Sequence, residues 1–284
     1  MIRRHLNRER TKTMTITLPA FTPLEESLFL TLCCRALDNR SEQPILGDAM
    51  ADEIVGKLDY DYEAMHISTD LMLNATLRAK KLDEVASRFL ARRPDAVGLD
   101  LGAGLDTRVV RLDPPSTVDW YDVDFPAVAS ARERLIPDRP SAHVVGADVR
   151  DPGWLDAIPT GRPALIVADG LMGFLSRDEF VSLLNLIISH FPSGEMVFNS
   201  YTPFTIWVAH HAPGTKTVAD LVKFPGFKDP HEPESWNPKL KLVEEILLSK
   251  DLAQVPSKLR PYYRLQAHST SWSRKGTIVL HYSF

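Results

Sequence analysis

The sequence predicts an α/β fold in which a mostly parallel, Rossmann-like sheet is flanked by helices. An apolar run ends in a loop with two glycines one residue apart, within AVGLDLGAGLD at residues 96–106. Strand-like and helix-like segments then alternate up to residue 200, which is typical of parallel sheets. Ligands bind at the carboxyl ends of such strands, so we expect the acids that follow the strands to meet there. These acids are Asp100, Asp124, Asp148 and Asp169.

Length and composition indicate a single globular domain. The chain has 284 residues, 44% of them hydrophobic and 25% charged, so we expect a single domain over residues 22–284. A formal net charge of −4 predicts no general attraction for nucleic acid. No apolar run approaches the ~20 residues needed to cross a membrane. Cys33 and Cys34 are adjacent and suit neither a disulfide framework nor a metal site, which indicates a reducing compartment and predicts a cytoplasmic protein without a metal.

The first ninety-five residues predict a leader followed by a helical cap. Residues 1–21 begin with a basic stretch that no apolar core follows, so we expect a disordered leader and not a secretory signal. Thr22 and Pro23 are typical of a helix start, and the pattern predicts one helix continuing to Leu37. Apolar spacing predicts two more helices, over residues 48–58 and 69–90. Residues 22–95 are therefore predicted to form the cap.

The glycine loop suggests what kind of ligand the sheet binds. Gly102 and Gly104 permit backbone angles that other residues avoid, and they let a ligand approach the backbone. Thr107 occupies the third glycine position of the dinucleotide fingerprint, which disfavours a nicotinamide-dependent oxidoreductase. Asp100 lies just before the loop, and its carboxylate suits a ligand with a cationic end better than a pyrophosphate. Asp124 ends a second strand about twenty residues further on, where nucleotide-binding folds place the acid that holds ribose hydroxyls.

The rest of the chain completes the alternation and adds an insertion. We expect strands over residues 142–147, 163–168, 195–200, 240–248 and 276–284, and helices over 125–135 and 177–191. Prolines, aromatics and histidines interrupt the pattern over residues 202–238, which predicts a lid over the sheet edge. Core packing or an apolar wall for a substrate would each explain its aromatic residues. They are Phe204, Trp207, Phe224, Phe227 and Trp236.

Six segments together resemble the leucine carboxyl methyltransferase family, in the branch of polyketide-tailoring O-methyltransferases. They are RALDNRSEQPILGD, LRAKKLDEVASRFL, VGLDLGAGLDTRVVRLD, WYDVDFPAV, ADVRDPGWLDAI and LIVADGLMGFL. The resemblance covers about residues 22–200 and is loose beyond them. It implies a class I methyltransferase fold and S-adenosylmethionine as the cofactor.

The resemblance also implies roles for individual residues. Gly102 and Gly104 would lie under the methionine part of the cofactor, with Asp100 shaping that loop. Arg78 would bind the methionine carboxylate, and Asp124 the ribose hydroxyls.

Further along the chain, the resemblance places Asp148 and the Val149 backbone at the adenine edge. Asp169 stands where the family usually has glutamate, and Phe174 where relatives commonly carry tyrosine. We expect the acceptor to be positioned by residues drawn from a short set of candidates. They are Arg40, Phe174, Tyr201 and His210.

The chemistry of methyl transfer leaves the acceptor open. A carboxylate, with a pKa near 4, is ionised at pH 7 and needs no general base. A phenol, with a pKa near 10, would favour a base, for which His210 and His211 are candidates. We expect a methyl ester on a small or polyketide-like acid. A phenol or hydroxyl acceptor, the C-terminal leucine of a protein, and a non-catalytic S-adenosylmethionine-binding protein stay open as alternatives.

Overall fold

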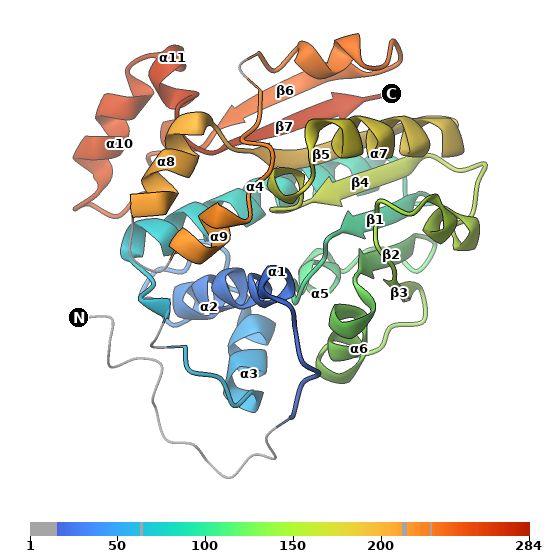
Figure 1. Ribbon diagram of the computed structural model, residues 1–284, viewed down its shortest axis with the longest axis horizontal. Helices are drawn as coiled ribbons and strands as arrows, with labels where there is room; N and C mark the ends of the chain where they lie inside the picture. The colour runs from blue at the N-terminus through green and yellow to red at the C-terminus, as the bar shows by residue number, and fades with distance from the viewer. Residues whose placement is uncertain (1–15, 63–64, 212–214, 228) are drawn as a thin grey trace.

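A central sheet organises the protein. The computed structural model describes residues 16–62, 65–211, 215–227 and 229–284, and the sheet it contains has seven strands in the order β3-β2-β1-β4-β5-β7-β6 (Figure 1). The strands from β3 to β5 run parallel, and β7 is antiparallel to both β5 and β6. The predicted mostly parallel sheet is confirmed. The strands are β1 (Val97–Leu101), β2 (Asp119–Asp124), β3 (Ala142–Gly146), β4 (Ala164–Ala168), β5 (Gly194–Ser200), β6 (Lys241–Leu247) and β7 (Ile278–Ser283).

Helices cover both faces of the sheet. Every residue of β4 is buried, as its unbroken apolar sequence predicts for a central parallel strand. Ile166 packs into a core with α7, whereas Leu165 and Val167 pack on the opposite face into a core with α4. The two helices accordingly flank the sheet in Figure 1. The flanking helices are α4 (Thr69–Arg92), α5 (Arg108–Leu112), α6 (Pro126–Leu135) and α7 (Arg177–His190).

Close packing at the centre of the sheet explains one glycine in β1. Gly98 pairs with Trp120 of β2, and Trp120 is fully buried. A Cβ atom on Gly98 would lie 2.3 Å from Cε3 of the Trp120 ring. The absence of a side chain at residue 98 therefore allows the largest ring of β2 to lie flat against β1.

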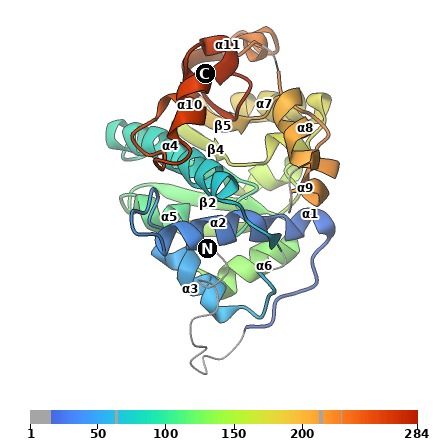
Figure 2. The ribbon, with the colours of Figure 1, turned by 90° about the vertical axis from the view of Figure 1, so that its left-hand side faces the viewer.

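The helical cap differs from its prediction at one point. The predicted helix from Thr22 to Leu37 is two helices, α1 (Pro23–Glu26) and α2 (Leu28–Asn39). Thr22 caps α1 through a capping box with Glu25, and Ser27 ends that single turn. The apolar side chains of α2 pack against α3 (Ala49–Lys57) and against α6, forming a core beside the sheet (Figure 2).

Part of the predicted leader is packed against this core. Residues 1–15 lie outside the described part of the chain, so the expectation of disorder concerns residues 16–21 alone. Ile16 forms a β-bridge with Leu58, and Arg134 donates a hydrogen bond to the Thr17 carbonyl at 2.8 Å. The apolar side chains at 16, 18 and 21 pack on the core of α2, α3 and α6, so the predicted leader boundary at residue 21 is wrong.

The segment after β5 forms short helices, and most of its aromatic residues do not form the expected apolar wall. Trp207 is exposed, whereas Phe227 and Trp236 pack with Phe180 of α7 in the sheet core. Phe224 packs against the same core, so the expected apolar wall is reduced to Phe204. The remaining helices and helical turns are η3 (Pro152–Ala157), η4 (Met172–Phe174), α8 (Pro203–His211), α9 (Lys216–Asp220), η5 (Glu232–Ser235), η6 (Leu248–Lys250), α10 (Arg260–Ala267) and α11 (Thr270–Ser273). Among the described helices, none is both long and apolar enough to cross a bilayer.

Candidate active site

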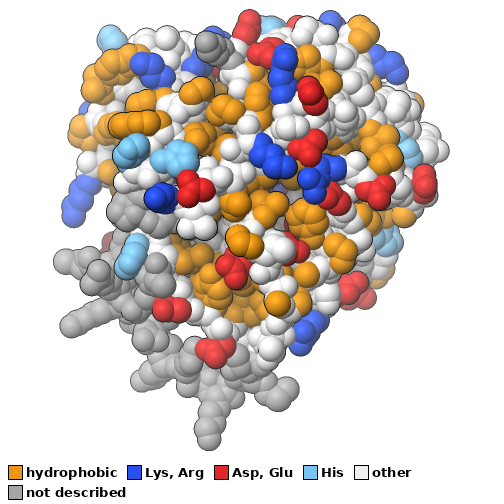
Figure 3. All heavy atoms as spheres, in the orientation of Figure 1, with side chains coloured by type: hydrophobic (Ala, Val, Ile, Leu, Met, Phe, Trp, Pro, Cys, Tyr) orange, Lys and Arg blue, Asp and Glu red, His pale blue; other side chains and the backbone are white. Residues whose placement is uncertain are grey.

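A cavity of about 460 Å³ lies at the carboxyl ends of β1, β2, β4 and β5. The cap helices α1, α2 and α4 border it on one side, and α8 and α9 border it on the other. Figure 3 shows hydrophobic side chains exposed on the face of the molecule over α8. The parallel sheet brings the predicted cofactor residues together, because their strands end at one edge. Those lining the cavity are Arg78, Asp100, Gly102, Gly104, Asp124, Asp148, Val149 and Asp169.

The glycine loop has the conformation that its sequence predicts. Gly102 has φ +65° and Gly104 has φ +50°, a region that residues with side chains rarely adopt. The Gly104 N–H donates to Asp124 Oδ2 at 2.6 Å, and the Phe125 N–H donates to Asp124 Oδ1 at 2.7 Å. Burial raises the pKa of Asp124, although both backbone bonds act in the opposite direction. The loop thus fixes a carboxylate that retains lone pairs facing the cavity.

Asp100 has a different partner from the one that its position suggests. Its Oδ2 accepts a hydrogen bond from Arg108 Nη1 at 2.7 Å, and the Arg108 side chain is fully buried. Arg108 also contacts Asp83 at 2.7 Å and Asp169 at 3.5 Å. Burial raises the pKa of Asp100 to about 7, although Arg108 acts in the opposite direction, and Asp100 Oδ1 has no hydrogen-bond partner among the described residues. The ion pair with Arg108 is the structural contribution of Asp100, and its expected role toward the cationic end of a ligand stays a prediction.

A second set of ion pairs fastens the cap to the loop. Arg111 contacts Asp48 of the α3 N-terminus at 2.8 Å and Asp106 at 2.7 Å. Arg35 of α2 donates to the Leu105 carbonyl at 3.0 Å and lies 3.2 Å from Asp48. Local sequence patterns do not indicate these pairings, because the paired residues lie on separate elements.

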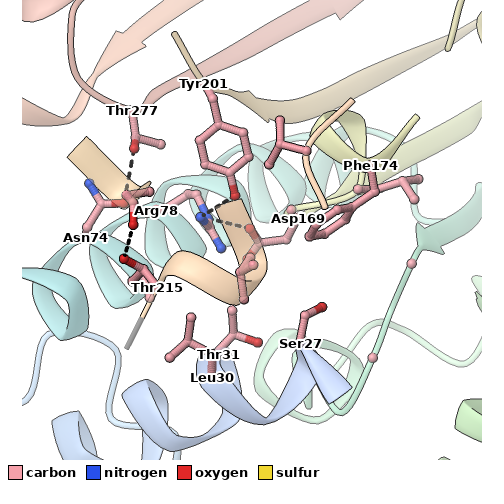
Figure 4. A pocket seen from close by; sticks show the side chains of 18 of the residues that line it. Ser27, Leu30, Thr31, Asn74, Arg78, Asp169, Phe174, Tyr201, Thr215 and Thr277 are labelled. Carbon is pink, nitrogen blue, oxygen red and sulfur yellow. Dashed lines mark hydrogen bonds and ion pairs between the residues drawn. The ribbon is translucent and has the colours of Figure 1, made fainter. Parts of the chain in front are cut away.

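Arg78 of α4 lines the cavity and lies between two polar side chains. Its Nε lies 2.5 Å from Asp169 Oδ1, and its Nη1 donates to the Tyr201 hydroxyl at 3.4 Å (Figure 4). Burial lowers the pKa of Arg78, but the contact with Asp169 outweighs it, so the net direction is upward and the guanidinium stays charged. Since a guanidinium carries five N–H donors, these two contacts leave others for an anion.

The adenine end of the predicted site lies at the rim. Asp148 accepts hydrogen bonds from the side chain and backbone of Arg150, the shortest at 2.5 Å, and these hold the pKa of its carboxyl below the usual value. Arg150 also contacts Glu179 of α7 at 3.3 Å. Val149 is buried beside them.

The four positioning candidates divide into two groups. Phe174 and Tyr201 line the cavity. Arg40 and His210 do not: Arg40 donates to Asp52 at 2.6 Å, and His210 contacts Asp220 of α9 at 3.1 Å. The expected positioning roles of Arg40 and His210 are corrected accordingly, because each side chain is directed at a neighbouring helix.

Several residues that line the cavity were not predicted from the sequence. Asn74 lies four residues before Arg78, on the same face of α4, and this helical spacing could have identified it. The others come from elements whose proximity the sequence does not reveal. They include Ser27, Thr31, His66, Gln266 and Thr277.

Comparison with known proteins places this cavity in a family. The family model for leucine carboxyl methyltransferases matches residues 29–188. The chain is 42% identical over 224 residues to the tetracenomycin polyketide synthesis O-methyltransferase TcmP of Streptomyces glaucescens, an alignment that covers 79% of this chain and 83% of the relative. It is 31% identical over 255 residues to the S-adenosyl-L-methionine-dependent methyltransferase dpfgK of Gibberella zeae, covering 82% and 85%.

Solved structures agree on the fold. The crystal structure of the mycolic acid cyclopropane synthase CmaA1 with bound SAH has a TM-score of 0.52 at 14% identity and covers 94% of this chain and 98% of that one. A protein from Thermobifida fusca YX has a TM-score of 0.54 at 20% identity, covering 88% and 93%. The predicted class I methyltransferase fold is confirmed.

The buried ion pairs generate a stability prediction. Arg108→Gln removes the shared cation from Asp83, Asp100 and Asp169, and breaking a buried pair costs about 3–5 kcal/mol. Asp83 keeps Arg111 and Asp169 keeps Arg78, so Asp100 is the carboxylate that loses its arginine. Burial already raises the pKa of Asp100 to about 7, and the loss of Arg108 raises it further, so the penalty is small at low pH and grows as the pH rises from the unfolded to the folded pKa. Urea unfolding should therefore show a larger loss at pH 7 than at pH 5.

The control is Arg88→Gln on α4, where an exposed arginine pairs with Glu244. Its effect should stay below about 1 kcal/mol at both pH values. Equal effects of the two substitutions would contradict the structural role of Arg108.

Proposed function

Because the chain belongs to the leucine carboxyl methyltransferase family, we propose that it methylates the carboxylate of a small or polyketide-like acid. It is an S-adenosylmethionine-dependent O-methyltransferase; TcmP is named an O-methyltransferase and dpfgK an S-adenosyl-L-methionine-dependent methyltransferase. The observation that carries the choice of a carboxylate is the content of the cavity around Arg78. The groups near Arg78 hold fixed charges: Asp169 lies between Arg78 and Arg108, and Arg108 also pairs with Asp100.

The residues at the strand ends fit the cofactor chemically. The spare donors of Arg78 suit its carboxylate, the fixed oxygens of Asp124 suit a ribose diol, and the bare backbone at Gly102 and Gly104 permits close approach. Asp148 and Val149 would hold the adenine edge at the rim. When bound, the cofactor supplies a methyl group on a sulfonium whose leaving group is neutral.

Candidate bases for a phenol lie away from this centre. His210 faces α9 and lies outside the cavity lining. His66 lines the cavity but precedes α4, whereas Arg78 lies nine residues into that helix, about 14 Å along its axis at 1.5 Å per residue. Asp169 is held between Arg78 and Arg108. A carboxylate acceptor, which is already ionised, suits a site of this kind.

Tyr201 is the group that we propose to hold the acceptor. Its oxygen accepts a hydrogen bond from Arg78, so its own O–H remains available to donate into the cavity. Donation to one carboxylate oxygen of the acceptor would leave the other oxygen free to attack. Catalysis then consists largely of positioning and exclusion of water.

Arg78→Ala should weaken binding of adenosylhomocysteine about ten- to a hundredfold. The lost interaction is a charge-assisted hydrogen bond, which contributes roughly 1.5–3 kcal/mol. Titration calorimetry measures it, with Arg88→Ala as the control from the exposed face of the same helix. Unchanged affinity in the Arg78 variant would remove this residue from the proposed cofactor site.

Asp124→Ala should weaken binding of adenosylhomocysteine by at least tenfold. The ribose hydroxyls lose their acceptor, and so do the backbone N–H groups of Gly104 and Phe125. Asp124→Asn should be intermediate, because one acceptor oxygen remains. Asp119→Ala, at the opposite end of β2, is the control and should bind normally. If Asp124→Ala binds as tightly as this control, the acid has no ligand role.

The acceptor is tested by the product and by the pH profile. With 2-naphthoic acid as the probe, we expect a methyl ester that mild alkali hydrolyses to methanol. The value of kcat/KM should stay flat from about pH 6 to 8, because the nucleophile is ionised throughout. A base-stable ether from a phenol, or a rate that rises tenfold per pH unit, would overturn the proposal, as would turnover confined to leucine-terminated peptides.

A further inference from the structure

We propose that Asn74 determines acceptor specificity by donating a hydrogen bond to a second oxygen of the acceptor. The preferred substrate would then be an acid that carries a hydroxyl or carbonyl oxygen about one helical turn from its carboxylate. This inference rests on the proposed function, because it takes the acceptor to be an acid held near Tyr201.

The position of Asn74 relative to Arg78 follows from the geometry of α4. Residues four apart lie on one face of a helix with Cβ atoms about 5–6 Å apart. Asn74 and Arg78 both line the cavity, and Arg78 carries the contact to Tyr201. Figure 4 shows Asn74 beside Arg78, on the side of the helix that faces Tyr201 and Thr277. A molecule held by Tyr201 can therefore reach Asn74.

The Asn74 carboxamide is anchored at one end and open at the other. Its Oδ1 accepts a hydrogen bond from the Thr277 hydroxyl at 3.2 Å, and Thr277 is buried just before β7. Among the described residues, no acceptor lies within hydrogen-bonding distance of Asn74 Nδ2. Asn74 is half-buried and lines the cavity, so this N–H₂ group is available for an oxygen of the ligand.

The surroundings make one such donor selective. The helices on the opposite side of the cavity present mainly apolar side chains. These are Ile206, Val208, Ala209, Val218, Ala219 and Val222. A site that hydrogen-bonds a polar group of its ligand favours that ligand over an analogue that lacks the group, because the bond is lost with the analogue. Asn74 should therefore discriminate between otherwise identical acids.

The experiment compares 4-hydroxy-2-naphthoic acid with 2-naphthoic acid, which differ by one hydroxyl meta to the carboxylate. Binding of each acid to the full chain saturated with adenosylhomocysteine is measured by calorimetry, and ester formation by kcat/KM. We expect the parent protein to prefer the hydroxylated acid by about tenfold. Asn74→Leu should abolish this preference, because the leucine side chain has no hydrogen-bonding group.

Asn185→Leu is the matched control, since Asn185 lies on α7 and bonds to Asn237 away from the cavity. It should retain the preference, and all variants should bind adenosylhomocysteine equally. A parent protein that binds neither acid or shows no preference, or an Asn74→Leu variant that keeps the preference, would overturn the inference. Asn74-dependent discrimination in binding without any ester would uphold the inference while the proposed reaction fails.

Discussion

The buried guanidinium of Arg108 is the contact on which the site depends. It joins Asp83 of α4, Asp100 of β1 and Asp169 at the end of β4, so one side chain ties a cap helix to two neighbouring strands. A fully buried cation carries a large desolvation cost, which surrounding carboxylates must offset. The ion pairs with Arg108 thereby hold the acids at these strand ends in fixed positions. The shape of this part of the cavity therefore depends on the balance of charge between Arg108 and the three aspartates.

This balance gives the strand-end acids two different tasks. Asp100 and Asp169 compensate buried arginines, and Asp169 lies between Arg78 and Arg108. Asp124 is held by backbone N–H groups and has no arginine directly upon it. A carboxylate anchored by neutral donors keeps its charge and its spare lone pairs for a ligand, which supports its proposed role with the ribose.

Arg78, Asp169 and Tyr201 lie between a polar part of the cavity and an apolar part. The glycine loop and Asp124 lie on the sheet side, and mainly apolar side chains come from α8 and α9. At the junction, a charged guanidinium and a phenolic O–H supply donors, and the nearby carboxylate is already paired. Such a site can orient an anionic nucleophile and keep water away. It is poorly suited to removing a proton, which is why we favour a carboxylate acceptor over a phenol.

The sequence by itself determined the sheet, the glycine loop and the acids at the strand ends. Periodicity and backbone preference are local properties, and the parallel topology then brings strand ends to one edge. The tertiary structure alone decided the direction of the Arg40 and His210 side chains and the burial of Phe227 and Trp236. Asn74 and Thr277 are 203 residues apart, and their hydrogen bond exists because α4 packs beside β7. Local patterns carry no record of such a pairing, since it depends on how complete elements pack.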